Sequence, residues 1–247
     1  MYNVIMDTKI FDRIEKKYLI SAKQKKEILK EVQKNMEKDG YFKSGVMNVY
    51  FDTDNFDLII KSIENPDFKE KLRARSYEGY DKVFLEIKTK MKQAEYRVGY
   101  KRRFLITHKD FEKLVAGEKT AVELASELIE TNDDIQIAKE VDYLISHFDL
   151  KPRILVYYDR ESYLGENGLR ITFDENLSFR DTDLSFVKKA SDKKYFKTDQ
   201  NIIMEIKAHE VMPLWLVQLL SKEKAYPPRF SKIGKIYELI KKGEKNV

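Results

Sequence analysis

Two short segments of the sequence, "FLEIKTK" and "IMEIKAH", place charged side chains at alternate positions among apolar ones. Glu86 and Lys88 alternate in the first segment, and Glu205 and Lys207 alternate in the second. Successive side chains of a β-strand point to opposite faces, so the acid and the lysine of each segment share one face. A carboxylate can bind a hard divalent cation and an ammonium group can bind phosphate oxygens, which are groups that phosphoryl transfer requires. Taken singly, each segment is also typical of an ordinary strand with one face in water.

Six strand-like segments carry a predominantly charged face of this kind. Eight residues on these faces are cations and three are glutamates, an excess equal to the net charge of +5 of the whole chain. The guanidinium group of arginine matches phosphate oxygens well, and a basic lining that is shielded from water requires a bound anion. The faces therefore predict a polyanionic ligand. They consist of Arg13, Glu15 and Lys17; Arg73 and Arg75; Glu86 and Lys88; Tyr158 and Arg160; Arg170 and Thr172; and Glu205 and Lys207.

The composition restricts the class of protein. The chain has 247 residues, of which 42% are hydrophobic, and this is enough to build a folded core. The absence of cysteine excludes disulfides, thiol nucleophiles and cysteine metal sites. No signal peptide pattern and no apolar run of the ~20 residues needed for a membrane span occurs, so we expect a cytoplasmic chain without a transmembrane segment. With nine glycines and five prolines there is no obvious linker, which predicts a single domain over residues 1–247.

Alternation and β-rich composition predict about eight strands, and short turns such as "SYEGYDK", "KMKQA" and "LGENG" indicate antiparallel neighbours. The predicted class is α+β, with an antiparallel sheet or eight-stranded barrel and helices packed outside. A barrel with charges inside and apolar residues outside reverses the usual arrangement, and helices covering its outside would explain it. The expected strands lie near residues 11 to 20, 44 to 52, 68 to 77, 81 to 90, 94 to 104, 151 to 162, 168 to 176 and 200 to 209.

Helical segments are expected between these strands. Ser21 can cap a helix that ends at Asp39-Gly40, and Thr107 can cap a short helix after the fifth strand. Residues 120–148 contain one or two more helices, and "PLWLVQLLSKE" and "SKIGKIYELIKKGE" are helical near the end of the chain. The Asp-rich stretch "YFDTD" could bind a metal, although a turn after a strand explains it more simply.

Eight motifs in order resemble the VTC domain, the polyphosphate polymerase branch of the triphosphate tunnel metalloenzymes, also called the CYTH-like superfamily. Each motif is weak alone, and the family assignment depends on their order and spacing over nearly the whole chain. The resemblance implies a tunnel of eight antiparallel strands whose basic side chains bind a nucleoside triphosphate or a phosphate chain. The motifs are "RIEKKYLI", "NVYFDT", "KLRARSY", "FLEIKTK", "YYDRESY", "GLRITFDE", "IMEIKAHE" and "PPRFSKIGK".

The resemblance also implies roles for individual residues. Glu205 corresponds to the metal-binding carboxylate, with Lys207 on the same face and Tyr158 beside the phosphate ligands. In the "PPRFSKIGK" motif, Ser231 can cap the helix that follows, and a helix N-terminus attracts phosphate. The implied phosphate ligands are Lys17, Arg73, Arg75, Lys88, Arg160 and Arg170, together with Arg229, Ser231 and Lys232 of the last motif.

The first strand departs from the wider superfamily. Its triphosphatases typically open with an E-x-E-x-K strand, whereas "RIEKK" carries Arg13, Glu15 and Lys17. Arg13 replaces a carboxylate by a cation, which fits a polymerase better than a two-metal hydrolase. Arg13 is thus a further candidate for phosphate binding, although pairing with Glu15 or Glu86 would make it structural. Glu15 and Glu86 remain candidate metal ligands beside the carboxylate implied by the family.

The expected activity is transfer of the γ-phosphoryl group of ATP to a growing polyphosphate chain, with Mn²⁺ or Mg²⁺ as cofactor. ATP, pyrophosphate and polyphosphate are the expected ligands, and polymer export would require a separate membrane protein partner. The protein is then expected in the cytoplasm or at the inner face of the membrane.

Two alternatives stay open: hydrolysis of tripolyphosphate or nucleoside triphosphates, and polyanion binding without catalysis. Nucleic acid is not expected, because an enclosed basic lining excludes a duplex. No P-loop, nucleophile elbow or Rossmann glycine pattern occurs.

Overall fold

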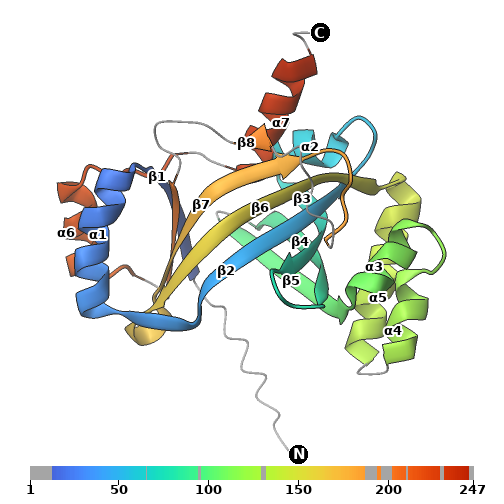
Figure 1. Cartoon of the computed structure of the whole chain (residues 1–247), viewed down its shortest axis with the longest axis horizontal. Coiled ribbons are helices and arrows are strands. Elements are labelled where there is room, and N and C mark those ends of the chain that lie inside the picture. The colour runs from blue at the N-terminus through green and yellow to red at the C-terminus, as the bar shows by residue number, and fades with distance from the viewer. Residues whose placement is uncertain are drawn as a thin grey trace, which may run out of the picture. The chain divides into compact units, whose positions relative to one another are not determined.

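The structure of the chain, a computed structural model, consists of antiparallel strands with helices packed against them (Figure 1). It describes residues 13–64, 66–93, 96–128, 132–186, 194–195, 202–209, 211–228 and 231–244. The strands are β1 (Arg13–Ile20), β2 (Glu37–Asp52), β3 (Phe68–Tyr77), β4 (Val83–Gln93), β5 (Tyr96–Ile106), β6 (Lys151–Leu164), β7 (Arg170–Arg180), β8 (Lys194–Tyr195) and β9 (Ile202–His209). The helices are α1 (Ala22–Asn35), α2 (Asp57–Glu64), α3 (His108–Val115), α4 (Ala121–Leu128), α5 (Asn132–Phe148), α6 (Leu214–Lys222) and α7 (Lys232–Glu244), and η1 (Glu166–Gly168) is a 3-10 turn.

The strands are hydrogen-bonded in the order β1-β9-β7-β6-β2-β3-β4-β5, and the short β8 pairs with β7. This arrangement confirms the α+β class and the antiparallel sheet. Within the described residues, β1 and β5 are the two ends of the path and no pairing joins them. The closed eight-stranded barrel is therefore not confirmed.

The chain divides into two compact units, and β2, β6 and β7 each contribute residues to both. Unit 1 contains residues 1–43, 160–175 and 198–229, and unit 2 contains residues 44–159, 176–197 and 230–247. Each unit has its own hydrophobic core. The single domain over residues 1–247 stays a prediction.

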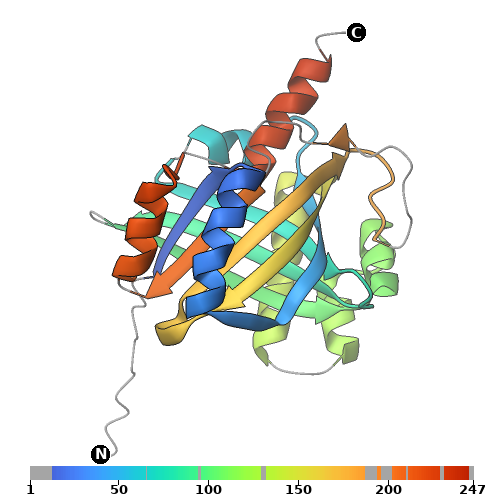
Figure 2. The same ribbon diagram turned by 60° about the vertical axis from the view of Figure 1, so that its left-hand side comes forward.

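In unit 1, α1 and α6 cover one face of the strands and lie side by side (Figure 2). Ile28 and Val32 of α1 and Leu216 of α6 pack against Phe173 of β7 in one apolar core. Ser21 caps α1 as expected, since its hydroxyl accepts the backbone N–H of Gln24 and the Gln24 side chain accepts the N–H of Ser21. The helices thus cover the apolar face, where Glu161 and Glu175 pair with Lys25 of α1. The candidate ligand side chains of these strands lie on the other face.

The first helix is shorter than the sequence predicted, and the second strand begins earlier. α1 ends at Asn35, because the next residue, Met36, is extended (φ −143°, ψ 152°) and only 7% exposed. The chain enters β2 at Glu37 rather than near residue 44. Burial of Met36 in the core of unit 1 explains this early stop. As a result Asp39, which the sequence placed at a helix end, is a strand residue.

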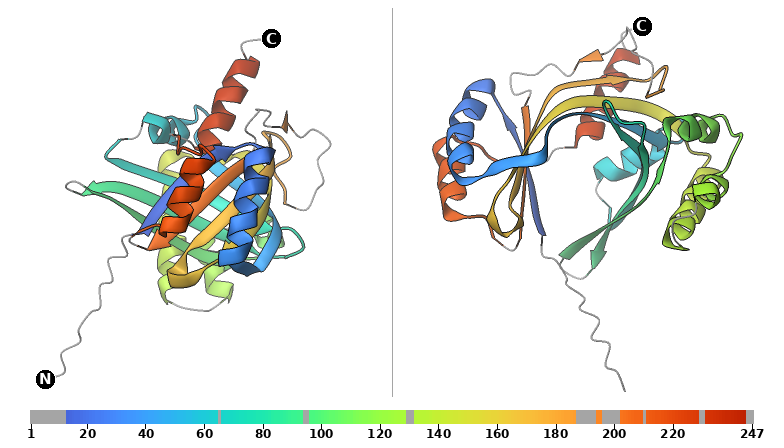
Figure 3. Two further views of the ribbon diagram at one scale, coloured as in Figure 1. Left: turned by 90° about the vertical axis from the view of Figure 1, so that its left-hand side faces the viewer. Right: turned by 60° about the horizontal axis from the view of Figure 1, so that its bottom comes forward.

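In unit 2, the apolar faces of β2 to β5 lie under α3, α4 and α5, which Figure 3 shows grouped beside these strands. Val49, Leu72, Leu85 and Ile87 are almost fully buried there together with Phe111 of α3. β3 and β4 are joined by the short turn predicted at "SYEGYDK", and the "LGENG" turn of unit 1 forms η1. The turn expected at "KMKQA" lies later, because β4 continues to Gln93. Residues 94 and 95, which connect β4 to β5, are outside the described part of the chain.

Asp52 organises a helix that the sequence analysis missed. Its carboxylate is fully buried and accepts the backbone N–H groups of Thr53, Leu58 and Ile59, each at 2.9 Å. The bonds from Leu58 and Ile59 satisfy N–H groups at the start of α2, which have no partner within the helix. Burial raises the pKa of Asp52. Asp54 instead pairs with Arg153 at 3.0 Å, so the geometry supports the turn interpretation of "YFDTD".

Candidate functional site

A row of charged residues crosses three strands of unit 2 on the face opposite its core. Glu86 of β4 stands in register between Arg73 of β3 and Arg103 of β5. Arg73 donates from Nε and Nη2 to Glu86 Oε2 at 2.7 and 2.5 Å, and Lys101 Nζ and Arg103 Nη1 lie 3.8 Å from Oε1. Glu86 is fully buried, and burial disfavours its charge, but Arg73 and Arg75 outweigh this and lower the pKa of Glu86. Glu86 is thus the counterion of a cationic cluster.

A second row, next to the first, contains three lysines in direct register. Lys88 of β4 stands between Lys71 of β3 and Lys101 of β5. Directly opposed side chains have Cβ atoms roughly 5 Å apart, and like charges at this separation repel. Burial and the nearby arginines lower the pKa of Lys101, although Glu86 opposes the shift. We call Lys71, Arg73, Arg75, Lys88, Lys101 and Arg103 the basic face of unit 2.

Other predicted ligands in unit 2 lie near this face or near α7. Arg75 Nε donates to Asn48 Oδ1 at 2.8 Å, so a neutral amide holds this guanidinium. Lys232 Nζ lies 4.2 Å from the ring centre of the buried Tyr158, a cation–π contact. Ser231 Oγ accepts the backbone N–H of Gly234 at 3.4 Å, which supports the predicted cap of α7. The structure therefore brings Tyr158 and Lys232 together in unit 2.

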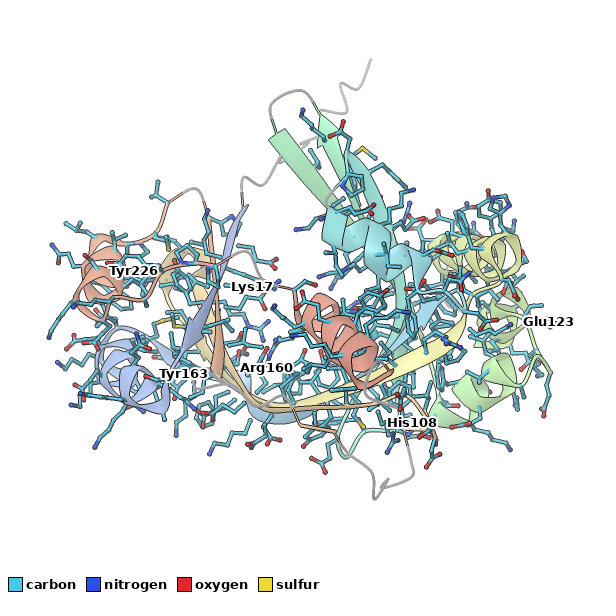
Figure 4. All side chains as sticks on the ribbon, turned by 90° about the horizontal axis from the view of Figure 1, so that it is seen from above. Lys17, His108, Glu123, Arg160, Tyr163 and Tyr226 are labelled. Atoms are coloured by element: carbon cyan, nitrogen blue, oxygen red, sulfur yellow. The ribbon has the colours of Figure 1, made fainter. Side chains whose placement is uncertain are left out.

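In unit 1, Lys17 and Arg160 lie on the face away from α1 and α6, where Figure 4 labels both. Arg160 donates to both oxygens of Asp174, from Nε at 2.6 Å and from Nη2 at 2.8 Å. Its Nη2 also lies 3.8 Å from Glu205 Oε2, and Lys207 Nζ lies 3.5 Å from Glu205 Oε1. Glu205 is 8% exposed. Glu205 and Lys207 therefore do not face open solvent, as a simple amphipathic strand would require.

Arg170 is held by two residues that the sequence analysis did not select. Its guanidinium lies 2.9 Å from Asp39 Oδ2, and its Nε donates to Ser162 Oγ at 3.1 Å. Ser162 in turn donates to Asp39 Oδ2 at 3.0 Å. Ser162 and Arg170 lower the pKa of Asp39 against the opposing effect of burial. A carboxylate and a hydroxyl thus orient this candidate phosphate ligand.

On β1 and β9, acids stand opposite bases. Lys17 is in register with Glu205, and Glu15 is in register with Lys207. Lys17 Nζ also lies 3.2 Å from Glu15 Oε1 on its own strand. The backbone of Arg13 pairs with His209, but the Arg13 side chain lies outside the described residues. Arg229 lies outside them entirely.

The two units therefore differ in charge balance, which the sequence count did not predict. Among the described side chains on the charged face of unit 1, four cations meet four carboxylates, because Asp39 and Asp174 join Glu15 and Glu205. The basic face of unit 2 has six cations around Glu86. Asp174 could have been identified from the sequence, because it stands two positions after Thr172 and four after Arg170 and so shares their face of the strand. Lys101 and Arg103 were harder to identify, since "YKRRFLI" carries charges on both faces of β5 and so lacks a clear polar alternation.

A divalent cation bound by these carboxylates would also need ligands from water or from the substrate. In the described part of the chain, no three His, Asp or Glu residues are grouped to hold a metal by themselves. Mg²⁺ commonly uses one or two carboxylates and takes its other ligands from water and substrate phosphates. Glu205, almost buried and flanked by phosphate-binding candidates, fits this kind of shared site. Glu86 accepts hydrogen bonds from Arg73, and Glu15 pairs with Lys17 at 3.2 Å.

Comparison with known proteins extends these observations. The chain is 26% identical over 147 residues to the vacuolar transporter chaperone complex subunit 4 of Schizosaccharomyces pombe and 28% identical over 155 residues to that of Trypanosoma brucei brucei. These alignments cover 55% and 54% of this chain, which spans about a fifth of the length of either relative (20% and 19%).

A solved structure has a similar fold. It is a putative adenylyl cyclase from Hippeastrum, described as having a dominant triphosphatase activity, and it is 16% identical with a TM-score of 0.53. The similarity covers 90% of this chain and 93% of the other, and it concerns the fold alone. The sequence pattern of the VTC domain matches residues 12–240. The chain therefore belongs to the VTC domain family.

Proposed function

We propose that this protein is a metal-dependent polyphosphate polymerase that transfers the γ-phosphoryl group of ATP to a phosphate chain. Membership of the VTC domain family and the relatives named above support a function in polyphosphate chemistry. The observation that carries the proposal is the basic face of unit 2, where Lys71, Lys88 and Lys101 stand in register beside Arg73 and Arg103. An anion with several consecutive charges matches such rows better than a single phosphate does.

The residues of the chain would act by binding and orientation. Arginine and lysine side chains hold the phosphates of donor and acceptor so that an oxygen of the acceptor chain faces the γ-phosphorus. A new P–O bond forms there while the bond from the γ-phosphorus to the bridging oxygen breaks, and ADP leaves with the electron pair. No protein nucleophile takes part. Asp174 and Asp39 position Arg160 and Arg170 for these contacts.

A metal ion would complete the neutralisation of charge. Glu205 is the residue that would hold it, together with the phosphates of the substrate. A bound Mn²⁺ or Mg²⁺ supplies Lewis acidity and stabilises the charge that develops on phosphate oxygens. Lys207, next to Glu205, would keep a phosphate oxygen close to this carboxylate.

One assay tests the proposal. The purified chain is incubated with ATP and either Mn²⁺ or Mg²⁺, and ADP, inorganic phosphate and polyphosphate chain length are measured. Polyphosphate formed together with ADP is expected. Release of inorganic phosphate without polymer would replace the proposal by triphosphate hydrolysis, the activity described for the structural neighbour. Tight binding of tripolyphosphate without turnover would leave only a binding module.

We also propose that the protein works with a separate membrane protein. The curated relatives are named as subunits of a transporter chaperone complex, and this chain spans about a fifth of their length. Co-purification of a membrane protein with the tagged chain from its native cells is the expected result. Recovery of the chain with soluble proteins alone would contradict it.

A further inference from the structure

Four apolar side chains are exposed on and beside α6 in unit 1. Leu214 is 71% exposed and Val217 is 44% exposed, and they lie one helical turn apart on the same face. Val211, just before the helix, is 74% exposed. Tyr226, just after it, is 70% exposed and lies next to α6 in Figure 4. A group of exposed apolar residues of this kind is typical of a surface that contacts another hydrophobic phase or molecule.

These side chains are not needed for the core of unit 1. Leu216, Leu219 and Leu220 of α6 are the residues that pack into that core, and Trp215 packs against it. Leu214 and Val217 therefore form a second apolar stripe, on the outer side of the helix. Polar side chains would be expected at these positions in a helix that only covers a sheet.

Exposed lysines lie at the end of α6 and at the neighbouring beginning of α1. The beginning of α1 meets the end of α6, where Gln24 Nε2 donates to the backbone oxygen of Glu223 at 2.8 Å. Lys23 and Lys26 flank this contact on α1, and Lys222 and Lys224 flank it on the other side, all four exposed. The pKa of Glu27 is lowered by its hydrogen bond with Lys30 and also by Lys26 of α1 and Lys222 of α6.

The lysines continue along the outer side of α1. Lys23, Lys26, Lys30 and Lys34 are all exposed, and their spacing places them on one stripe of the helix. The acids of this helix, Glu27 and Glu31, form exposed pairs with Lys30 and Lys34, which are weak in water. The outer side of α1 thus carries an excess of positive charge, and α1 lies beside α6 (Figure 2).

We propose that this surface, defined by Lys23, Lys26, Leu214, Val217, Lys222 and Tyr226, docks unit 1 on an anionic lipid bilayer. The apolar side chains enter the boundary between head groups and acyl chains, and the lysines contact anionic head groups. None of the described helices has the length and hydrophobicity of a membrane span, so such contact is peripheral. The proposal does not depend on the polymerase activity.

The charges favour a bilayer over the other candidate occupants. A second copy of the same surface would bring two sets of lysines together, and like charges repel across an interface. Soluble polyphosphate would bind the lysines but has no group that contacts Leu214 or Val217. A lipid surface supplies both negative charge and an apolar phase.

The test uses the purified chain and sedimenting vesicles. One set contains phosphatidylcholine alone, and the other contains about a third phosphatidylglycerol, which gives a negative surface. The bound fraction is expected to be at least roughly tenfold higher on the anionic vesicles and to fall with added salt. Equal binding to both sets, or no binding to either, would overturn the proposal.

Paired variants separate the two contributions. Leu214→Ser with Val217→Ser is expected to lower binding to anionic vesicles by about tenfold. Lys23→Glu with Lys26→Glu is expected to remove the preference for anionic vesicles. Val115→Ser on α3, at 41% exposure, and Lys109→Glu with Lys139→Glu in unit 2 are matched controls that keep full binding. Loss of binding in these controls as well would show that the contact is not specific to this surface.

Two further measurements exclude a different explanation. Circular dichroism should show that Leu214→Ser with Val217→Ser folds as the wild type does, since both side chains are exposed. Size-exclusion chromatography with light scattering should give the same mass for both proteins. A wild-type dimer that this variant dissociates, together with absent vesicle binding, would instead identify a second copy as the occupant.

Discussion

Arg160 binds Asp174 through two parallel hydrogen bonds, at 2.6 and 2.8 Å, and the Asp174 carboxylate is completely buried. This fork geometry fixes the plane of the guanidinium group, because both donors of one edge are used. The Nη2 atom also lies 3.8 Å from Glu205. Asp174 therefore orients Arg160, a candidate phosphate ligand that also lies near the candidate metal carboxylate.

Replacing Asp174 should test this positioning role. Asp174→Asn keeps the shape but removes the charge of the closer of the two carboxylates near the largely buried Arg160, which costs about 3–5 kcal/mol of unfolding free energy. Displacement of Arg160 should reduce turnover of ATP on the order of 100-fold. Steady-state kinetics should show the loss mainly in kcat if orientation is the cause. Unchanged kinetics in a destabilised variant would make Asp174 purely structural.

Glu205→Gln tests the proposed metal contact. The amide retains the size of the side chain but binds Mn²⁺ or Mg²⁺ weakly, because hard cations prefer carboxylates. We expect turnover to be abolished while tripolyphosphate binding without metal persists. Glu15→Gln is the control, since Glu15 pairs with Lys17 at 3.2 Å on the same face. Full activity of the Glu205 variant would remove this residue from the metal site.

The basic face of unit 2 gives a prediction with an adjacent control. Lys101→Ala should weaken tripolyphosphate binding by roughly tenfold to 100-fold, the value expected for one charge-assisted contact. Arg102→Ala should leave the affinity nearly unchanged, because Arg102 points to the other face and pairs with Glu140 at 3.0 Å. Isothermal titration calorimetry at two salt concentrations measures both. Equal losses in the two variants would mean that only the total charge matters.

Lys25 gives a prediction for stability and its pH dependence. Lys25 Nζ pairs with Glu161 at 3.0 Å and Glu175 at 2.8 Å, and burial of Lys25 is outweighed by these bonds, which raise its pKa. Lys25→Met should lower the free energy of unfolding by about 2–4 kcal/mol, because it leaves two carboxylates without their shared cation. Lys30→Met is the control and should change little, since its pair with Glu27 is exposed.

The sign of the pH effect follows from the two shifted groups. The raised pKa of Lys25 contributes stability that is complete below its usual 10.5 and is lost as the pH rises through the raised value. The pKa of Glu161 is lowered by Lys25 against burial, so its contribution is complete above 4.5 and is lost as the pH falls through the lowered value. Urea denaturation should therefore show the largest difference between wild type and Lys25→Met between pH 4.5 and 10.5.

Local patterns were sufficient for much of the fold. The caps at Ser21 and Thr107 were predictable, since a short polar side chain before a helix accepts its unpaired N–H groups. α2 was not predicted, because the residue that caps it, Asp52, lies five residues before its first turn at the end of a strand. The end of α1 was also missed, since burial of Met36 depends on distant core residues.

For the candidate site, the sequence by itself determined which side chains share a face, because alternation along a strand has a fixed period of two. It thereby identified Glu205, Lys207 and Arg73 as members of charged faces. Only the tertiary structure decided which charges meet, because register joins residues far apart in the chain. Arg170 contacts Asp39 across 131 positions, and Lys17 stands opposite Glu205. Strand pairing thus balances the charges of unit 1 and concentrates cations in unit 2.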